Sequence, residues 1–559
     1  MNTVFPVLGS LVLMALGYRF YSKYLAQKIY RLDDSNVTPS IAMEDGVDYV
    51  PTHRAIVFNH HFASIAGLSP ILGPALAVIW GWFPTILWLV VGSVLMGAVH
   101  DMSSLVLSIR NEGRSIGQVA NNLVGARARI LFLMIIFFAL ALAMAVFVKV
   151  VSQLLQSSAE NFQTYPGAVF PSGMLMIIAL ICGVLLRKKI IGLLPVSIIG
   201  TLLAFICIWI GTFLPIYVSY NTLLYGLLIY AFAASVLPVW ILLQPRDFIN
   251  AFALYIGMIL LYLVVFMFQP HFVAPAINPN PDLPNMIPLL FVIVACGAIS
   301  GFHSLVASGT TSKQISKETD ARPIGYGAML AEGALGIIAV VACTAGLNSE
   351  EQWLVYYQSW TSAQGLGANL SVFVQGSANL IGNLGIPVEF GATFIALVVV
   401  SFALTTLDSG TRILRYNVEE IADTFHLSFL KNRYGATLIA IAAIWYLAVS
   451  KWGTTLWVLF GTTNQLLAGL ALLTATVYLV TNKRPSWVTS VPMVVMLIIT
   501  FWALLLNLKS YIAKGEAPLI VVGAAIMLLS IGLIFEVILF FVKHHSGPKS
   551  TSAETEAVK

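Results

Sequence analysis

Long apolar segments recur along the whole chain, and each is close to the length that a helix needs to cross a bilayer. A helix rises 1.5 Å per residue, so about 20 apolar residues span the hydrocarbon core. Windows of this length predict fifteen membrane spans in an all-α, polytopic membrane protein. The expected spans are 4–24, 57–80, 85–107, 128–151, 170–187, 192–214, 221–243, 249–268, 286–310, 324–346, 389–410, 434–450, 453–480, 486–507 and 517–542.

Composition agrees with this pattern. Of 559 residues, 59% are hydrophobic and 9% are charged, and the mean hydropathy is +0.89. A soluble domain is about 25% charged, and no segment here is long and polar enough to form one. The net charge of +5 lies in short loops, so it does not indicate nucleic-acid binding. The four cysteines lie singly in apolar segments, which fits neither a disulfide framework nor a zinc site.

Basic residues alternate between the loops and so predict the topology, because Lys and Arg favour the cytoplasmic side. The loops at 153–171 and 270–285 contain no Lys or Arg, whereas the loops after the spans 85–107, 170–187 and 221–243 are basic. The N-terminus is therefore expected outside, and the tail 544–559 is expected to be cytoplasmic and disordered. A full crossing by 365–387 would place the basic run 412–433 outside. This Gly-, Ser- and Asn-rich segment is therefore predicted to be a re-entrant or interfacial hairpin.

The span at 57–80 carries Gly67, Ser69 and Pro70 in its middle. Proline lacks a backbone donor and collides with the preceding turn. At membrane depth, freed backbone groups are tolerated only inside protein or beside a watery cavity. A broken span is therefore a candidate binding site, although a simple proline kink would give the same pattern.

A second span repeats this feature, with Ser235 and Pro238 in the middle of 221–243. With the first span set aside, two sets of five spans enter the membrane from opposite sides. This predicts a five-plus-five inverted repeat, the LeuT-like arrangement, unless the small residues of the second span are coincidental. The expected units are an accessory helix and loop at 1–56, repeats at 57–214 and 221–433, and accessory helices at 434–543.

Two facing interruptions would form a site halfway across the membrane. Half-helix N-termini offer unpaired N–H groups and a partial positive charge, which suit a small anionic or zwitterionic solute. The predicted substrate-binding residues are Ala66, Gly67, Ser69, Pro70, Ala234, Ser235, Pro238 and His303.

Hydroxyl groups at the end of the span 286–310 are candidates for cation coupling. In the five-plus-five fold this is the eighth core helix, and its inner half lies against the first break, where sodium-coupled relatives bind sodium. Ser308, Thr310 and Thr311 occupy that part of the span. The alternative is that these hydroxyls bond to carbonyls four residues earlier in the same helix.

Ionisable side chains at membrane depth are costly and mark functional sites. His60 and His61 begin one span, and His100 and Asp101 lie near the inner end of the next, so a hairpin would bring all four to a similar depth. Histidine titrates near neutral pH, so a proton relay or gate is one interpretation. Interfacial anchoring is another, and a metal site is a minor possibility; no cofactor is expected.

Three further ionisable residues lie inside spans. His303 is surrounded by small residues, which favours a place beside a cavity and a role in proton coupling. Glu332 has no evident partner. Asp408 precedes Arg412 by four residues, a spacing that predicts an ion pair along one helix.

Several stretches resemble the carbon starvation protein CstA family of bacterial inner-membrane transporters. The similar stretches are 60–67 with Gly73-Pro74, 97–101, 111–115, 237–247, 297–311, 404–408 and 460–468. The resemblance covers nearly the whole chain. It implies a secondary transporter related to the amino acid–polyamine–organocation superfamily. Members of the CstA family are described as importers of peptides or as proton-coupled importers of pyruvate.

The expected function is therefore a cation-coupled symporter for a small carboxylate-bearing nutrient, with protons favoured over sodium. Partners would be the solute and the lipid bilayer, without nucleic acid, and the oligomeric state stays open. A channel and a metal-dependent membrane enzyme are the alternatives. The chain carries no Walker A or dinucleotide fingerprint, which argues against transport driven by ATP.

Overall fold

The structure is a computed structural model that describes residues 1–46, 48–123, 125–160, 162–188, 190–237, 239–363, 365–450 and 455–545. Helices dominate these residues, whose only β contacts are the isolated bridges Asn2–His271 and Thr52–Ile315. The all-α prediction is confirmed. The helices are α1 (Val4–Leu16), α2 (Ser22–Tyr24), α3 (Pro39–Ala42), α4 (Arg54–Ile65), α5 (Ser69–Ala77), α6 (Trp82–Gly92), α7 (Ala98–Ile109), α8 (Ile116–Leu123), α9 (Ala126–Leu155), α10 (Val169–Arg187), α11 (Leu193–Phe213), α12 (Tyr220–Val236), α13 (Val239–Phe268), α14 (Met286–Ile293), α15 (Gly301–Gly309), α16 (Ala328–Ala345), α17 (Glu350–Tyr357), α18 (Trp360–Ala363), α19 (Leu366–Gly382), α20 (Val388–Thr424), α21 (Arg433–Ala448), α22 (Thr455–Thr481), α23 (Trp487–Lys514) and α24 (Ala517–His545).

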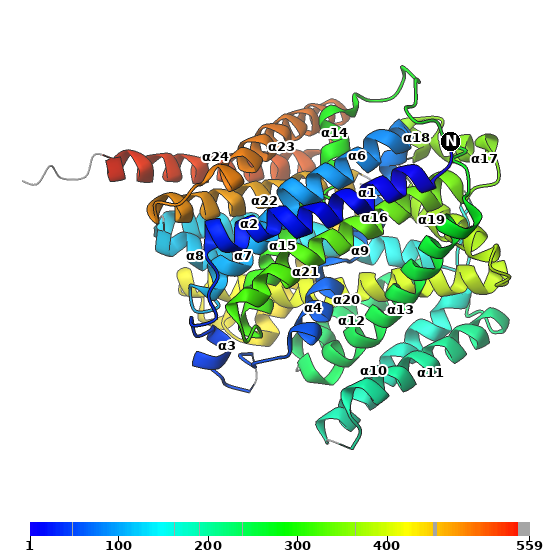
Figure 1. The fold of residues 1–559 in the computed structure, drawn as a ribbon, viewed down its shortest axis with the longest axis horizontal. Helices are drawn as coiled ribbons and strands as arrows, with labels where there is room; N and C mark the ends of the chain where they lie inside the picture. The colour runs from blue at the N-terminus through cyan, green and yellow to red at the C-terminus, as the bar shows by residue number, and fades with distance from the viewer. Residues whose placement is uncertain are drawn as a thin grey trace, which may run out of the picture.

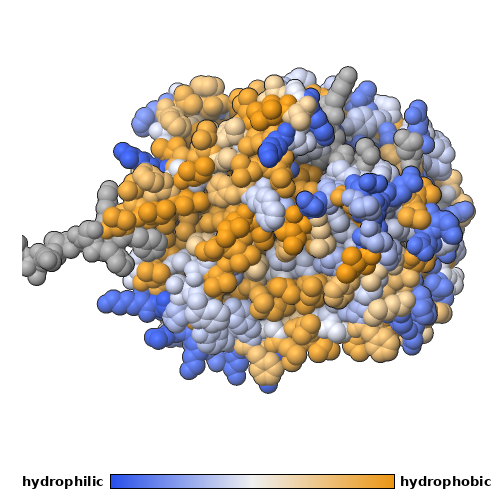
Figure 2. Space-filling model, turned by 90° about the horizontal axis from the view of Figure 1, so that it is seen from above, coloured by the Kyte–Doolittle hydropathy of each residue, from blue (hydrophilic) through white to orange (hydrophobic). Residues whose placement is uncertain are grey.

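Eleven helical stretches in the described residues are long and apolar enough to cross a membrane, and twelve if the bent pair α4–α5 is one span. Two further apolar helices, α12 and α21, are shorter. Apolar side chains gather over the middle of the face seen in Figure 2, and hydrophilic ones gather toward its ends. This distribution is that of a polytopic membrane protein. The fifteen spans and the inverted repeat stay predictions.

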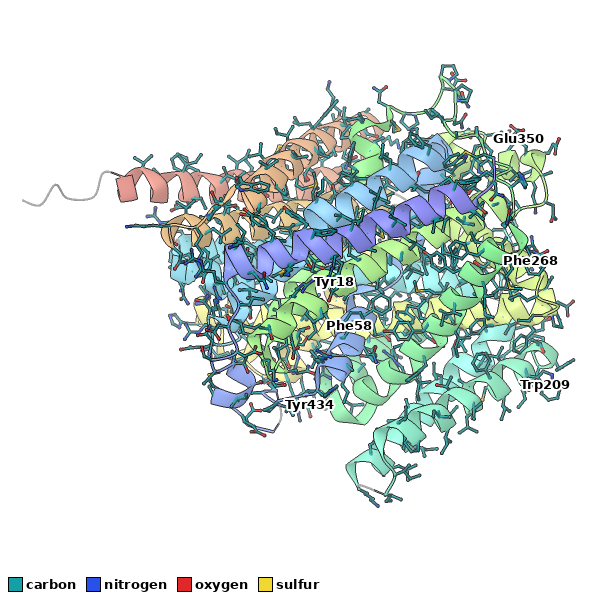
Figure 3. All side chains as sticks on the ribbon, in the orientation of Figure 1. Tyr18, Phe58, Trp209, Phe268, Glu350 and Tyr434 are labelled. Atoms are coloured by element: carbon teal, nitrogen blue, oxygen red, sulfur yellow. The ribbon has the colours of Figure 1, made fainter. Side chains whose placement is uncertain are left out.

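The bundle has a buried centre and a lipid-like periphery. In the most apolar 18-residue stretch of α20, and also in that of α22, 94% of the residues are buried. In the corresponding stretch of the N-terminal helix at Val4–Tyr30, 22% of the residues are buried. The helices α10 and α11 pack side by side along one edge (Figure 1). Trp209 projects from α11 at this edge (Figure 3) and is 59% exposed. The four cysteines are buried and free.

The first predicted break is present. The helix α4 ends at Ile65, α5 begins at Ser69, and the two axes differ by 45°. Pro70 lies in the first turn of α5, where its missing N–H removes no intrahelical bond. Gly67 packs against α20 so closely that a Cβ atom would lie 2.2 Å from Thr406 Oγ1. Local chemistry and close packing together hold the interruption.

The second predicted break is also present, because in the segment 221–243 α12 ends at Val236 and α13 begins at Val239. Two other expectations are corrected. The segment 286–310 is two helices, α14 and α15, separated by the non-helical residues 294–300. The segment 365–387 contains one continuous helix, α19, so it forms no hairpin of its own. The tail from residue 546 lies outside the described residues.

Candidate functional site

Two interrupted segments lie against each other at the centre of the bundle. The helix α5 contacts α14 while α4 contacts α15, so the two segments run antiparallel. Their approach is close, since a Cβ atom on Gly73 would lie 2.6 Å from the carbonyl oxygen of Ile293. The interruption that faces Ala66–Leu68 is therefore 294–300. The sequence analysis had paired it with the one between α12 and α13.

A small cavity of about 10 Å³ lies between these interruptions. This is close to the space that one water molecule occupies. The hydroxyls of Ser69 and Thr406, which line it, have no hydrogen-bond partner among the described residues. Polar groups buried without a partner are costly, so this pair is available to a polar atom of a bound molecule. The remaining lining residues are Ile65, Gly67, Ala143, Met144, Phe147, Cys296, Phe302 and Phe460.

Side chains from distant helices bind the interruption at 294–300 and the first turn of α15, which follows it. Asn464 Oδ1 accepts a hydrogen bond from the Phe302 N–H at 2.8 Å, and its amide nitrogen donates to Ser300 Oγ at 3.0 Å. Trp88 Nε1 donates to the Val294 carbonyl at 3.2 Å. Non-helical backbone at membrane depth needs such internal partners. The apolar pattern of 286–310 does not predict this interruption; the polar Asn464 inside an apolar span is the sequence signal that points to it.

The junction of α12 and α13 is closed by protein groups. Arg412 Nη2 donates to the carbonyl of Ala234 at 2.7 Å and also to that of Leu237. The hydroxyl of Ser235 lies 3.2 Å from that of Thr437. Neither Ala234 nor Ser235 lines the cavity at the first break. Pro238 lies outside the described residues.

His303 lies between two carboxylates. Its Nδ1 is 2.8 Å from Asp101 Oδ2 and its Nε2 is 3.2 Å from Glu332 Oε2, and all three side chains are fully buried. His100 Nδ1 lies 2.7 Å from the other oxygen of Asp101. The contact with Asp101 is a hydrogen bond, whereas His303 Nε2 and both carboxylate oxygens of Glu332 have no hydrogen-bond partner among the described residues. A proton bound by His303 places a positive charge between the two carboxylates. The cluster is therefore built to hold a proton.

The hydroxyls considered for a sodium site have other partners. Ser308 Oγ donates to the Ser304 carbonyl at 2.6 Å, and Thr310 Oγ1 donates to the Val306 carbonyl at 3.1 Å. These bonds match the back-bonded alternative. Thr311 Oγ1 lies 2.8 Å from His61 Nδ1.

His60, His61, His100 and Asp101 do not converge. His60 faces Asp247, His61 faces Thr311, and only His100 and Asp101 contact each other. Within the described ranges, no group of three or more His, Cys, Asp or Glu side chains could hold a metal ion.

A second buried charge cluster joins α13 to α20, and the sequence analysis did not predict it. Arg246 Nη1 lies 2.7 Å from Asp408 Oδ2, which also accepts a hydrogen bond from the Tyr230 hydroxyl at 2.7 Å. The expected pair between Asp408 and Arg412 is therefore wrong, because Arg412 binds carbonyls of α12 instead. The sequence signal was Asp408 inside an apolar span; Arg246 lies between the expected spans 221–243 and 249–268, which the structure joins in part as the single helix α13.

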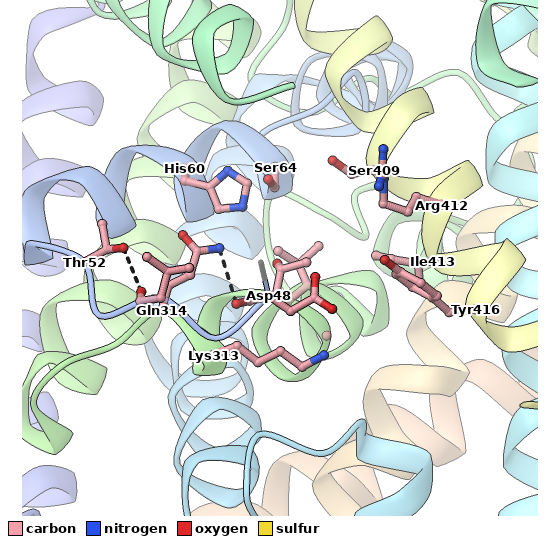
Figure 4. A pocket seen from close by; sticks show the side chains of 14 residues that line it. Asp48, Thr52, His60, Ser64, Lys313, Gln314, Ser409, Arg412, Ile413 and Tyr416 are labelled. Carbon is pink, nitrogen blue, oxygen red and sulfur yellow. Dashed lines mark hydrogen bonds between the residues drawn. The ribbon is translucent and has the colours of Figure 1, made fainter. Parts of the chain in front are cut away.

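A vestibule of about 90 Å³ lies beside the first break (Figure 4). Its lining runs from Asp48, in a loop, and Lys313, in the 3-10 helix Thr311–Lys313, to Ser64 on α4. Ser64 directly precedes Ile65, which lines the central cavity. The vestibule therefore reaches within one turn of the interruption, from the face that carries the basic loops. Further lining residues are Val50, Thr52, His60, Val306, Gly309, Thr310, Gln314, Ser409, Arg412, Ile413 and Tyr416.

Comparisons with known proteins place these features in context. A family model described as carbon starvation protein CstA matches residues 2–355 and 356–503. A peptide transporter CstA of Helicobacter pylori is 35% identical, with 90% of this chain and 81% of that protein covered. The pyruvate/proton symporter BtsT of Escherichia coli is 33% identical, with 91% and 82% covered. A manganese transporter structure from Eremococcus coleocola covers 89% of this chain and 99% of its own, with a TM-score of 0.46 and 12% identity.

Proposed function

The chain belongs to the carbon starvation protein CstA family, and on that premise we propose that it is a proton-coupled symporter for small carboxylate-bearing nutrients. Its family and its named relatives make it a multi-pass bacterial membrane transporter and not an enzyme. The proposal adds the coupling ion, the class of substrate, and an inner-membrane orientation with the N-terminus outside. Pyruvate and short peptides are the two candidate substrates, since relatives are named for each.

One observation carries the substrate site: two antiparallel interruptions face each other across a cavity with unpartnered hydroxyls. In this proposal, Gly67, Ser69 and Thr406 contact the solute, and its carboxylate lies near the N-terminal end of α5, where backbone N–H groups favour an anion. The cavity of about 10 Å³ is smaller than either substrate. Binding therefore requires α4–α5 to move away from α20.

Proton coupling is assigned to Asp101, His303 and Glu332. These residues lie on α7, α15 and α16, and α15 follows the interruption at 294–300. A shift of α15 during transport would change the distances on both sides of His303. Protonation and the position of the broken segment are then linked, which is what coupling requires.

The vestibule supports alternating access. It opens on the side of the basic loops and stops one turn from the central cavity. We assign this face to the cytoplasm because of its Lys and Arg residues. In this proposal the vestibule is the inner path, and it is not yet continuous with the central cavity.

Uptake into proteoliposomes tests the proposal. Labelled pyruvate and labelled dialanine are each offered under an inward proton gradient, an inward sodium gradient, or none. We expect one of them to accumulate with the proton gradient alone, with saturation and counterflow. Protein-free liposomes are the control. Accumulation driven only by sodium would contradict proton coupling, and uptake without saturation or counterflow would favour a channel.

A further inference from the structure

The second charge cluster has unequal numbers of positive and negative groups. Arg246, Asp247 and Asp408 are 1%, 2% and 0% exposed, and the ionised trio sums to one negative charge. Asp408 takes the close contact with Arg246 at 2.7 Å, whereas Asp247 Oδ1 lies 3.8 Å from Arg246 Nη2. The Arg246 guanidinium therefore pairs mainly with Asp408, and the negative charge of Asp247 is only partly compensated.

Asp247 has few other partners. Neither of its carboxylate oxygens has a hydrogen bond to another described residue. The closest remaining basic group is His60, whose Nδ1 lies 3.6 Å from Asp247 Oδ2. A buried carboxylate that must share its counter-charge and has no hydrogen bond is disfavoured. One proton, on either His60 or Asp247, brings the four-residue cluster to zero charge.

His60 connects this cluster to water. Its side chain is 14% exposed and lines the vestibule, in contrast to the fully buried His303. Figure 4 shows the His60 ring above Gln314, with Ser64 beside it on α4. A proton on His60 can therefore transfer to a vestibule water molecule, which becomes hydronium, without any movement of the buried residues.

The other charged and titratable groups nearby make neither a hydrogen bond nor an ion pair with Asp247 within the part of the chain that the structure describes. On α20, Arg412 is held by two carbonyls of α12, and on α12 the Tyr230 hydroxyl donates to Asp408. On α4, His61 turns to Thr311. Asp48 and Lys313, which also line the vestibule, bring opposite charges.

We propose that His60 and Asp247 form a second proton-binding site, which exchanges its proton with the vestibule on the release side of the transporter. This inference rests on the proposed proton symport and adds the place where the proton leaves. It predicts that net transport depends on the pH of the receiving compartment through His60. Substrate exchange, which needs no net proton release, does not depend on it.

The test uses full-length protein in oriented proteoliposomes, with labelled pyruvate or dialanine, whichever the wild type accumulates. His60→Gln and Asp247→Asn are compared with His271→Gln, which alters an exposed histidine in the loop after α13. We expect both cluster variants to retain counterflow within about twofold and to lose proton-driven accumulation by about tenfold, the scale of a typical coupling free energy. Their uptake should no longer vary with lumenal pH. His271→Gln should match the wild type.

The outcomes separate this inference from the proposed function. Wild-type protein that accumulates neither probe under a proton gradient would overturn both. Wild-type coupling that survives in His60→Gln, with an unchanged lumenal pH profile, would overturn the second site alone. Loss of counterflow in the cluster variants would also overturn it, because the residues would then be needed for substrate movement itself.

The variant His60→Lys controls for the possibility that the other variants lose coupling because they fold poorly. It keeps a positive charge beside Asp247 and should therefore insert at wild-type levels. We expect this variant to exchange substrate without proton-driven accumulation. Proton-driven accumulation by His60→Lys at the wild-type level would overturn the inference.

Discussion

The two buried clusters have the same number of carboxylates but different bases. Asp101 and Glu332 flank a histidine, whereas Asp247 and Asp408 share an arginine. Arginine keeps its charge at every relevant pH, and histidine gains or loses its charge near neutrality. The first cluster can therefore change its own charge, whereas the second needs an additional group, His60, to do so.

The clusters also differ in their access to water. The residues of the first are fully buried and line neither the central cavity nor the vestibule. The second reaches the vestibule through His60. A sealed site suits the retention of a proton while the substrate moves, and a connected site suits its release. Mutations that remove a permanent charge and mutations that remove a titratable group should therefore have different effects in the two clusters.

The largest effect is expected from Asp408→Ala. Removal of this carboxylate leaves Arg246 buried without its close partner, and breaking a buried pair in this way costs about 3–5 kcal/mol. Thermal unfolding in detergent measures the loss. Asp423→Ala is the matched control, because Asp423 pairs with Lys431 on the surface, and it should cause no measurable change.

The double variant Arg246→Met with Asp408→Leu sharpens this result. Apolar residues that replace a whole buried pair often restore stability. We expect wild-type thermal stability without proton-driven uptake. An equal, small effect of Asp408→Ala and Asp423→Ala would show that the buried pair does not stabilise the fold.

Gly67→Ala is expected to abolish transport of either substrate. The added Cβ would lie 2.2 Å from Thr406 Oγ1 and would fill the space between the break and α20. Overpacking of this kind also costs about 1–3 kcal/mol. Labelled uptake at equal membrane abundance is the measurement. Gly226→Ala on α12 is the control, because its Cβ would meet nothing within 4 Å; normal uptake by Gly67→Ala would place the solute elsewhere.

Glu332→Gln should reduce proton-driven uptake by about tenfold, again the scale of a coupling free energy. Without this acid, His303 loses one of the two carboxylates that favour its protonated form. Wild-type uptake should rise as the outer pH falls, because the proton is a co-substrate, and the variant should show a flatter profile. Glu389→Gln, at the exposed start of α20, should keep the wild-type profile. An unaltered profile in Glu332→Gln would remove the first cluster from coupling.

The smallest effect is expected from Thr310→Ala. Its hydroxyl bonds the Val306 carbonyl of its own helix, and a single change of this kind costs within about 0.5 kcal/mol. Uptake under separate proton and sodium gradients should match the wild type. Loss of a sodium-dependent component in this variant would restore the sodium interpretation of the hydroxyls.

The first break could be predicted because its causes are local. Pro70 cannot donate a backbone hydrogen bond, and Gly67 lacks a Cβ, so the segment is a poor helix wherever it packs. The break at 294–300 contains no proline. It has partners that are remote in sequence. Trp88 donates to the Val294 carbonyl, and Asn464 binds Ser300 Oγ and the Phe302 N–H in the first turn of α15.

Charge pairing shows the same limit. The four-residue spacing of Asp408 and Arg412 favours a pair along one helix, yet Asp408 contacts Arg246 on α13. A spacing rule covers only neighbours on one helix. At the centre of a bundle, each side chain also meets residues from several other helices, and those contacts decide its partner.

The sequence by itself determined that the chain is helical, that it lies in a membrane, that its first long apolar segment after the N-terminal helix is broken, and that His303, Glu332 and Asp408 lie inside apolar segments. These properties depend on apolar length and on backbone chemistry within a turn or two. Only the tertiary structure decided which interruption faces the first break and which acid meets which base. Those choices depend on contacts between helices that are far apart along the chain. The hydropathy pattern cannot select among them, because it is the same whichever helices pack together.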